Sequence, residues 1–196
     1  SNRQDIVHAV EQETPFTMRV LSDEQEAYYG YFAIINSTFL TDGYSVDIGG
    51  GSMEVTLIEN REMIAYHSFP FGAVTLTRQF LSGETMTSGE QKKLIKFLRE
   101  QFDEIPWLKN KKLPLIGVGG SARNFVRIHQ STLDYPLHGI HQYQVRSKEL
   151  GKLIDELEDK APKQLMKVEG LSKDRVDIFL PALIAIHELA LHIEAE

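Results

Sequence analysis

Asp47-Ile48-Gly49-Gly50-Gly51-Ser52 joins the end of one β-rich run to the start of another. Apolar and polar residues alternate over 43–48, and a second β-rich run, 53–58, follows at once, so we predict two antiparallel strands joined by a tight turn. Three glycines remove every Cβ from the turn, so backbone N–H groups can approach an anion closely. Asp47 would repel a bare phosphate, which indicates a divalent cation or an aligned water between them. An ordinary glycine-rich hairpin is the alternative interpretation of this motif alone.

A second glycine turn, Gly117-Val118-Gly119-Gly120-Ser121, closes an apolar strand and opens a helix. The free N–H groups of a helix N-terminus and the positive end of its dipole favour anions there. Arg123 falls in the first helical turn and adds a charge-assisted grip on an oxyanion. A plain strand-to-helix connection that uses glycine for space is the alternative. Neither turn has the lysine of a Walker A loop or the G-x-G-x-x-G pattern of a dinucleotide site.

Composition limits the classes of function that remain. A chain of 196 residues with 42% hydrophobic content predicts one globular domain, or one domain plus a fragment of another. The net charge of −7 argues against general nucleic-acid or anionic-membrane binding. The absence of cysteine excludes disulfides, thiolate catalysis and Cys-ligated metals, and fits a cytoplasmic protein. Residues 1–14 do not resemble a signal peptide, and the apolar stretch 178–193 is too short and too polar to span a bilayer.

Three meandering strands followed by a helix–strand–helix unit predict an α/β fold with a mixed sheet flanked by helices. Ser22 and Gln25 form a capping box that begins a helix ending near Ser37, and Ser88 with Gln91 is predicted to cap another that ends near Glu104. Pro181 predicts a kink or a restart within the last helix. The expected strands are 43–48, 52–59, 62–70 and 113–118; the other expected helices are 4–12, 75–81, 122–129, 147–158 and 173–193.

Several motifs, taken together, resemble those of the exopolyphosphatase and guanosine pentaphosphate phosphohydrolase (Ppx/GppA) family. Residues 47–54 are similar to its second phosphate loop, and 21–27 to its Ser-Gly-x-Glu-Glu-Ala helix start. Residues 71–76 are similar to its Gly-Ala-Val-x-Leu segment, 117–123 to its Gly-x-Gly-Gly-Thr turn, and 170–177 to its terminal Gly-Leu…Arg-Ala-Asp helix. These matches occur in family order over about residues 16 to 190. The family has the ribonuclease H-like fold of the actin, Hsp70 and sugar-kinase superfamily.

The resemblance implies a metal-assisted phosphohydrolase that removes the terminal phosphate of inorganic polyphosphate or of pppGpp, acting as a homodimer in the full-length protein. Glu26 matches the carboxylate that aligns the attacking water, with Glu24 as the fallback. Asp47 and Glu54 match carboxylates that hold Mg²⁺ directly or through water. Matching positions for phosphate binding are Gly49, Gly50, Gly51, Ser52, Gly119, Gly120, Ser121 and Arg123.

Three departures qualify the resemblance. The family's first phosphate loop, Asp-x-Gly-Ser-Asn-Ser, is absent, so residues 1–38 are interpreted as a hinge helix with a remnant of a first domain and 39–196 as the second actin-like domain. We therefore expect little activity from this stretch alone. Met53 stands where Thr is usual, and Gln25 and Tyr28 replace the commoner Glu and Arg beside Glu26. These changes leave open the preference between polyphosphate and pppGpp.

Two other classes of function remain open on sequence grounds. One is a regulatory module that binds polyphosphate or pppGpp without turning it over, and the other is part of an ATP-using actin-like kinase or chaperone. The pair His187-Glu188 with His192 resembles a zinc motif, but a spacing of five places the two histidines on different helix faces. Trp107 is expected to be a packing anchor, and His138 and His141 to lie in a solvated loop.

Overall fold

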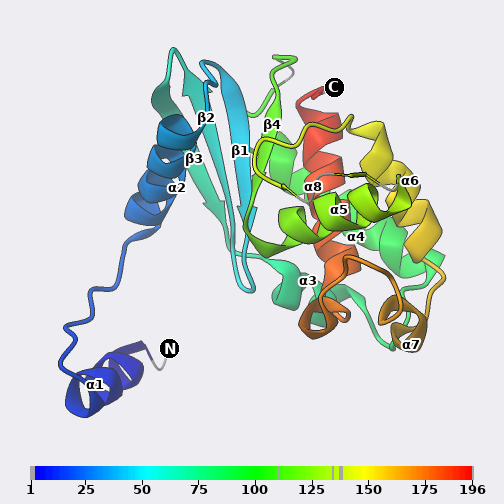
Figure 1. The fold of residues 1–196 in the computed structure, drawn as a ribbon, viewed down its shortest axis with the longest axis horizontal. Coiled ribbons are helices and arrows are strands. Elements are labelled where there is room, and N and C mark those ends of the chain that lie inside the picture. The colour runs from blue at the N-terminus through cyan, green and yellow to red at the C-terminus, as the bar shows by residue number, and fades with distance from the viewer. Residues whose placement is uncertain (1–2, 110, 134, 137–138, 196) are drawn as a thin grey trace.

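A mixed four-stranded sheet forms the centre of the molecule (Figure 1). The computed structural model describes residues 3–109, 111–133, 135–136 and 139–195, so His138 lies outside the described residues. The strand order is β3-β2-β1-β4, with β1 antiparallel to β2 and parallel to β4. The strands are β1 (Gly43–Ile48), β2 (Met53–Glu59), β3 (Glu62–Phe69) and β4 (Leu115–Val118).

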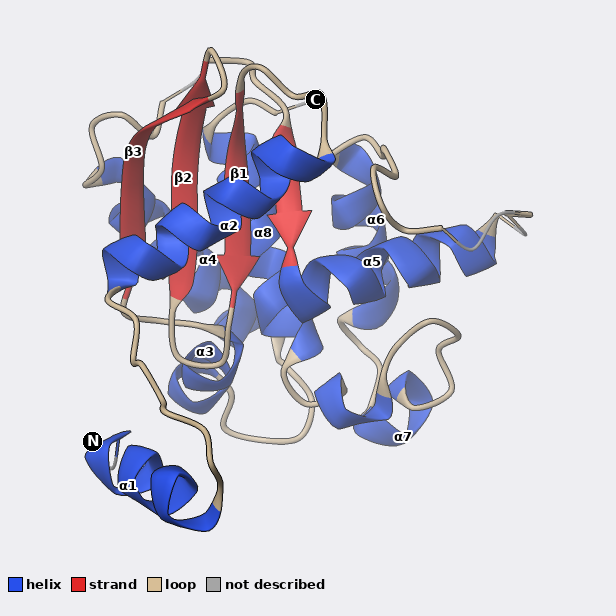
Figure 2. Cartoon of the chain, turned by 60° about the vertical axis from the view of Figure 1, so that its left-hand side comes forward, coloured by secondary structure: helices blue, strands red, loops and turns tan. Residues whose placement is uncertain are grey.

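Helices cover both faces of this sheet. Helix α2 lies alone on one face, and α3, α4, α5, α6 and α8 lie on the other (Figure 1). Helix α1 stands apart from the sheet and is joined to α2 by an extended segment (Figure 2). The helices are α1 (Arg3–Glu13), α2 (Asp23–Ser37), α3 (Ala73–Phe80), α4 (Ser88–Asp103), α5 (Gly119–Thr132), α6 (Lys148–Leu157), α7 (Pro162–Leu165), a short 3₁₀ turn (Lys173–Arg175) and α8 (Phe179–His192).

The two faces of the sheet differ in chemistry because alternate residues of a strand point to opposite sides. Tyr44, Val46 and Ile48 of β1 join the large apolar core under α4 and α8. On the opposite face, under α2, Ile58 packs against Tyr31 and Ile34, and Ile116 and Val118 of β4 join this smaller apolar cluster. Toward the glycine turns this face carries the polar side chains of Ser45, Asp47, Glu54 and Thr56. A polar strip therefore lies between α2 and the strand ends.

The helix starts show which sequence predictions hold. The Ser22–Gln25 capping box is confirmed. The cap of α4 is Thr87 with Glu90, so the prediction of Ser88 with Gln91 is wrong by one residue. The Glu90 carboxylate accepts hydrogen bonds from both Ser82 and Thr87, which lower its pKa to about 2, and a neutral Gln91 cannot offer charge-assisted bonds of that kind.

The C-terminal helix restarts as predicted. The 3₁₀ turn ends before α8 begins at Phe179, and Pro181 occupies the third helical position, where a missing amide leaves no bond unmade. In the described part of the chain, no helix has the length and apolar character needed to cross a bilayer. Trp107 packs against the core and stacks on Tyr44, as expected of a packing anchor.

Candidate functional site

The two glycine turns lie at the same edge of the sheet. Strands β1 and β4 are parallel neighbours in which Asp47 is paired with Val118, so the turns that follow them leave the sheet side by side. Gly119 has φ +81°, and a Cβ there would lie 2.3 Å from Oδ1 of Asp47. The side chain of Asp47 therefore occupies the space that the second turn leaves open, so Asp47 adjoins both turns.

The first turn is fixed in position by α3. Amides of Ala73 and Val74 donate to the carbonyl oxygens of Gly49 and Gly50 at 2.8 and 2.9 Å. A Cβ on Gly72 would come within 2.6 Å of the Gly49 oxygen, so only glycine allows α3 to approach this closely. The carbonyls thus point toward α3, while the exposed amides of Gly50 and Gly51 have no acceptor among the residues that the structure describes. Such amides are suited to an incoming anion.

The second turn opens α5 directly at Gly119. Arg123, one turn along α5, is exposed, and Ser121 beside it is 1% exposed. The guanidinium of Arg175 lies against the turn, because a Cβ on Gly120 would be 2.2 Å from its Cζ. Arg175 arrives from the 3₁₀ turn, more than fifty residues downstream of Gly120. Two cations therefore flank the glycines at this wall of the site.

Two carboxylates face each other beneath α2. Asp47 and Glu54 are directly paired across β1 and β2, and Ser68 of β3 donates a hydrogen bond of 2.9 Å to Glu54. Burial, and secondly the charge of Glu54, raise the pKa of Asp47, while Arg123 and Arg175 act in the opposite direction. A pair of carboxylates that repel each other in a partly dry site is well suited to share a cation.

A small cavity of about 30 Å³ connects these groups to α2. Its volume is sufficient for an ordered water, which needs roughly 10–15 Å³ and several polar partners. Glu26 lines this cavity together with Asp47 and Glu54, whereas Glu24 is not part of its wall. The remaining lining residues are Ala27, Gly30, Ile34, Ser45, Thr56 and Val118.

The protein offers a metal ion two carboxylate ligands and not a complete coordination shell. Within the described ranges, no group of three His, Asp or Glu side chains is placed to hold a metal ion. His187 faces Gly151 of α6 and His192 lies near Asp103 of α4, so the zinc-like pair points to two different helices. Asp47 and Glu54 fit a hard cation such as Mg²⁺, which commonly takes one or two carboxylates and completes its shell with water and phosphate oxygens.

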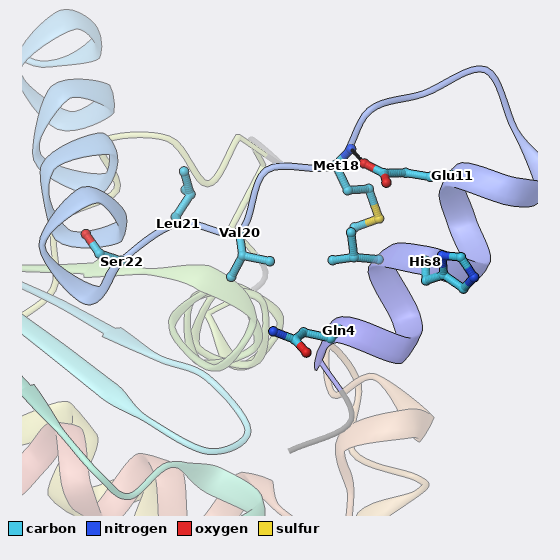
Figure 3. A pocket seen from close by; sticks show the side chains of 8 residues that line it. Gln4, His8, Glu11, Met18, Val20, Leu21 and Ser22 are labelled. Atoms are coloured by element: carbon cyan, nitrogen blue, oxygen red, sulfur yellow. Dashed lines mark hydrogen bonds between the residues drawn. The ribbon is translucent and has the colours of Figure 1, made fainter.

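A second hollow is lined by residues outside the glycine turns. It is an open space of about 660 Å³ between α1 and the extended segment before α2 (Figure 3). Gln4, His8 and Glu11 line it from α1, and Met18, Val20, Leu21 and Ser22 from the segment. The amide of Met18 donates to the Glu11 carboxylate at 3.0 Å, which holds the segment against α1. None of the predicted site residues lines this hollow.

Three residues at the site were not predicted to belong to it. Arg175 was recognised only as part of a terminal helix motif, and nothing in its sequence position shows that its guanidinium returns to Gly120. Gly72 and Gly30 were not singled out either. Gly72 comes just before an expected helix and Gly30 lies inside one, and a glycine at either kind of position can mark a close approach of two segments or an open space.

The fold is that of the actin-like α/β proteins, as expected. Superposition on a Ppx/GppA family member from Aquifex aeolicus gives a TM-score of 0.80 at 20% identity over 100% of this chain and 64% of that one. An exopolyphosphatase from Cytophaga hutchinsonii gives 0.84 at 18% identity over 98% of this chain and 64% of that one.

The sequence matches define the family. The chain is 26% identical over 195 residues to a bifunctional 3-dehydroquinate synthase/phosphatase of Fusobacterium nucleatum, covering 96% of this chain and 29% of that protein. It is 29% identical over 149 residues to Exopolyphosphatase 2 of Mycobacterium tuberculosis, covering 74% of this chain and 46% of that protein. The model of the Ppx/GppA phosphatase family matches residues 1–196, and the chain therefore belongs to this family. It spans less than half the length of these curated relatives.

Proposed function

We propose that this chain is the phosphate-binding part of a phosphohydrolase that removes the terminal phosphate of inorganic polyphosphate or of pppGpp. The observation that carries the proposal is the convergence of two glycine turns and three carboxylates at one edge of the sheet. Hydrolysis of a phosphoanhydride needs an oriented water and neutralisation of charge on the phosphoryl oxygens, and little covalent help from the protein. The two turns, the flanking arginines and the cavity under α2 provide these elements.

The terminal phosphate is assigned to the space between the turns. Gly50 and Gly51 bind it from one side through their backbone amides, and Gly49 and Ser52, joined by a 3.0 Å hydrogen bond from the Gly49 amide to the Ser52 carbonyl, close the same turn around it. Gly119, Gly120 and Arg123 bind it from the other side, where the N-terminus of α5 adds a favourable dipole. Ser121 belongs to this wall too, but its burial makes it a support of the turn more than a direct ligand. Arg175 is added to the phosphate ligands because its guanidinium lies against Gly120.

Asp47 and Glu54 are assigned to Mg²⁺ or another divalent cation. Asp47 is the more accessible of the two, and Glu54 is held in place by Ser68. The bound ion supplies charge neutralisation for the phosphate oxygens. Burial and, secondly, repulsion from Glu54 raise the pKa of Asp47, and a cation between the two carboxylates relieves that repulsion.

Glu26 is assigned to the attacking water. It lies at the start of α2 on the side that faces the cavity, and the cavity has room for that water beside Asp47. A carboxylate in this place orients the water and accepts its proton as the oxygen approaches phosphorus. Glu24 does not line the cavity and is not needed for this role.

A module that binds polyphosphate or pppGpp without hydrolysis is the second candidate. Such a module would use the same glycine turns and arginines. Asp47 and Glu54 would then serve only to bind the cation. The placement of Glu26 on the cavity favours hydrolysis, because binding alone does not require a carboxylate beside the water. Residues 1–38 are proposed to belong with a first domain that supplies the other wall, in a homodimeric full-length protein.

Phosphate release by the full-length protein tests this assignment. Polyphosphate, pppGpp and ATP are compared as substrates for the wild type, Glu26→Gln and the matched control Glu24→Gln. We expect release from one of the first two substrates, a loss of about 100-fold or more in E26Q, and little change in E24Q. Binding of polyphosphate without release by the wild type would favour the regulatory module, and release from ATP alone would contradict both.

A further inference from the structure

Helix α2 carries Glu26 in its first turn, so whatever holds α2 in place also positions Glu26. The N-terminal end has its own capping box and three acidic residues that suit the helix dipole. The C-terminal end has no basic residue in its last turn. Side chains of Asn36, Ser37 and Thr38 bind the carbonyls of the residues four positions before them, whereas the carbonyls of Ile35 and Ser37 accept from residues elsewhere in the fold.

Arg61, in the turn between β2 and β3, is one of these residues. Its guanidinium donates to the carbonyl oxygens of Ile35, of Thr38 at 3.3 Å and of Leu40 at 2.9 Å. In return, the hydroxyl of Tyr31 in α2 donates to the carbonyl of Arg61 at 2.8 Å. The turn thus grips α2 at two points, and a cation lies at the negative end of the helix dipole. His141 lies at hydrogen-bond distance, 2.8 Å, from the Ser37 carbonyl.

The backbone of Arg61 is unusual for an arginine. Asn60 and Arg61 have φ values of +51° and +63°, as a two-residue type I′ hairpin turn requires. Glycine is the preferred residue at the second of these positions, because a side chain there carries a conformational cost. The hydrogen bonds of the Arg61 guanidinium to α2 and to the residues after it offset that cost.

We propose that Arg61 is a positioning residue for the water site: it fixes the placement of α2 along the sheet and thereby the distance between Glu26 and the glycine turns. The inference rests on the role proposed above for Glu26. Arg61 grips α2 at Ile35, about 14 Å along the helix from Glu26 at 1.5 Å per residue, so it touches neither substrate nor water. Its loss leaves the phosphate ligands intact and displaces the carboxylate that faces them.

Arg61→Gly is the variant of choice because Asn-Gly is the favoured sequence for this turn, so the hairpin is retained while the guanidinium is removed. In the full-length protein we expect kcat for phosphate release to fall on the order of tenfold with KM within about twofold of wild type. Hydrogen exchange of the amides at the C-terminal end of α2 should accelerate about tenfold. Arg61→Lys, which keeps a cation, should recover part of both.

Asn60→Gly is the matched control, since it alters the same turn and leaves the guanidinium in place. It should match wild type in kcat and in exchange. Equal kcat and equal α2 exchange in R61G and wild type would overturn the inference, as would a loss of kcat in N60G as large as that in R61G. If the wild-type protein releases no phosphate, the proposed function fails, while hydrogen exchange still decides whether Arg61 holds α2.

Discussion

Replacing Gly30 by alanine should stabilise the protein and at the same time abolish its water site. Gly30 lies in the middle of α2, where glycine costs about 1 kcal/mol relative to alanine. Apart from its chain neighbours and the backbone of α2 itself, no atom lies within 4 Å of the position of its Cβ, so the methyl group meets no obstacle. For a chain of this size, about 1 kcal/mol corresponds to a rise in Tm of roughly 2–4 °C.

The same methyl group enters the cavity that Gly30 lines. That cavity measures about 30 Å³, against the roughly 10–15 Å³ that one ordered water needs, so a methyl group that enters it takes space from the water. Displacing a positioned nucleophile by an ångström already costs on the order of 100-fold in rate. We therefore expect phosphate release in Gly30→Ala to fall by about 100-fold or more.

Thermal denaturation and phosphate release are measured together on the full-length protein. Gly89→Ala is the matched control, because Gly89 lies in the first turn of α4, far along the chain, and its Cβ would meet only one atom at 4.0 Å. The control should leave release unchanged. Full activity in a stabilised Gly30→Ala variant would refute the assignment of the water to this cavity. A lowered Tm would contradict the expectation that a methyl group at position 30 meets no obstacle.

Other perturbations separate the phosphate loop, the cation and the core. Gly72→Ala should destabilise the protein by about 2–5 kcal/mol, because its Cβ would overlap backbone atoms of the first glycine turn and break the hydrogen bonds from α3. Gly51→Ala has open space around its Cβ, so it should leave the Tm unchanged and weaken the binding of tripolyphosphate measured by calorimetry. Because its pKa is raised in the folded state, Asp47 favours folding only while protonated and loses that contribution as the pH rises through the folded pKa. With EDTA present, Asp47→Asn should therefore raise the Tm at about pH 7 and not at about pH 3. Without EDTA, added Mg²⁺ should raise the Tm of the wild type and leave that of Asp47→Asn unchanged. Arg99→Ala should cost about 1–2 kcal/mol in urea unfolding, because the buried Glu188 loses a 2.7 Å partner.

Local signals in the sequence predicted most of the fold. Alternation in 43–48 and the glycine turn after it predicted the antiparallel β1–β2 hairpin, and Ser22 with Gln25 predicted the start of α2. The start of α4 was misplaced because Thr87 and Ser88 both offer a capping box. The choice between them depends on Ser82, which donates to Glu90 from six residues before the helix.

The composition of the site was predicted less completely. The two glycine turns and Asp47 follow strands that the sequence reveals, so their meeting at one sheet edge could be inferred. Arg175 and Arg61 reach the site and α2 through long-range contacts that no local pattern encodes. Gly30 was not singled out, because its role depends on a cavity that exists only after α2 has packed on the sheet.

The most direct test is a titration of this chain, labelled with ¹⁵N, with tripolyphosphate in the presence of Mg²⁺. If both turns bind one phosphate group, the amide resonances of Gly50, Gly51, Gly119 and Gly120 shift together along a single binding curve, and the shifts disappear in Asp47→Asn. Shifts confined to one turn, or two curves with different midpoints, would contradict a shared phosphate site.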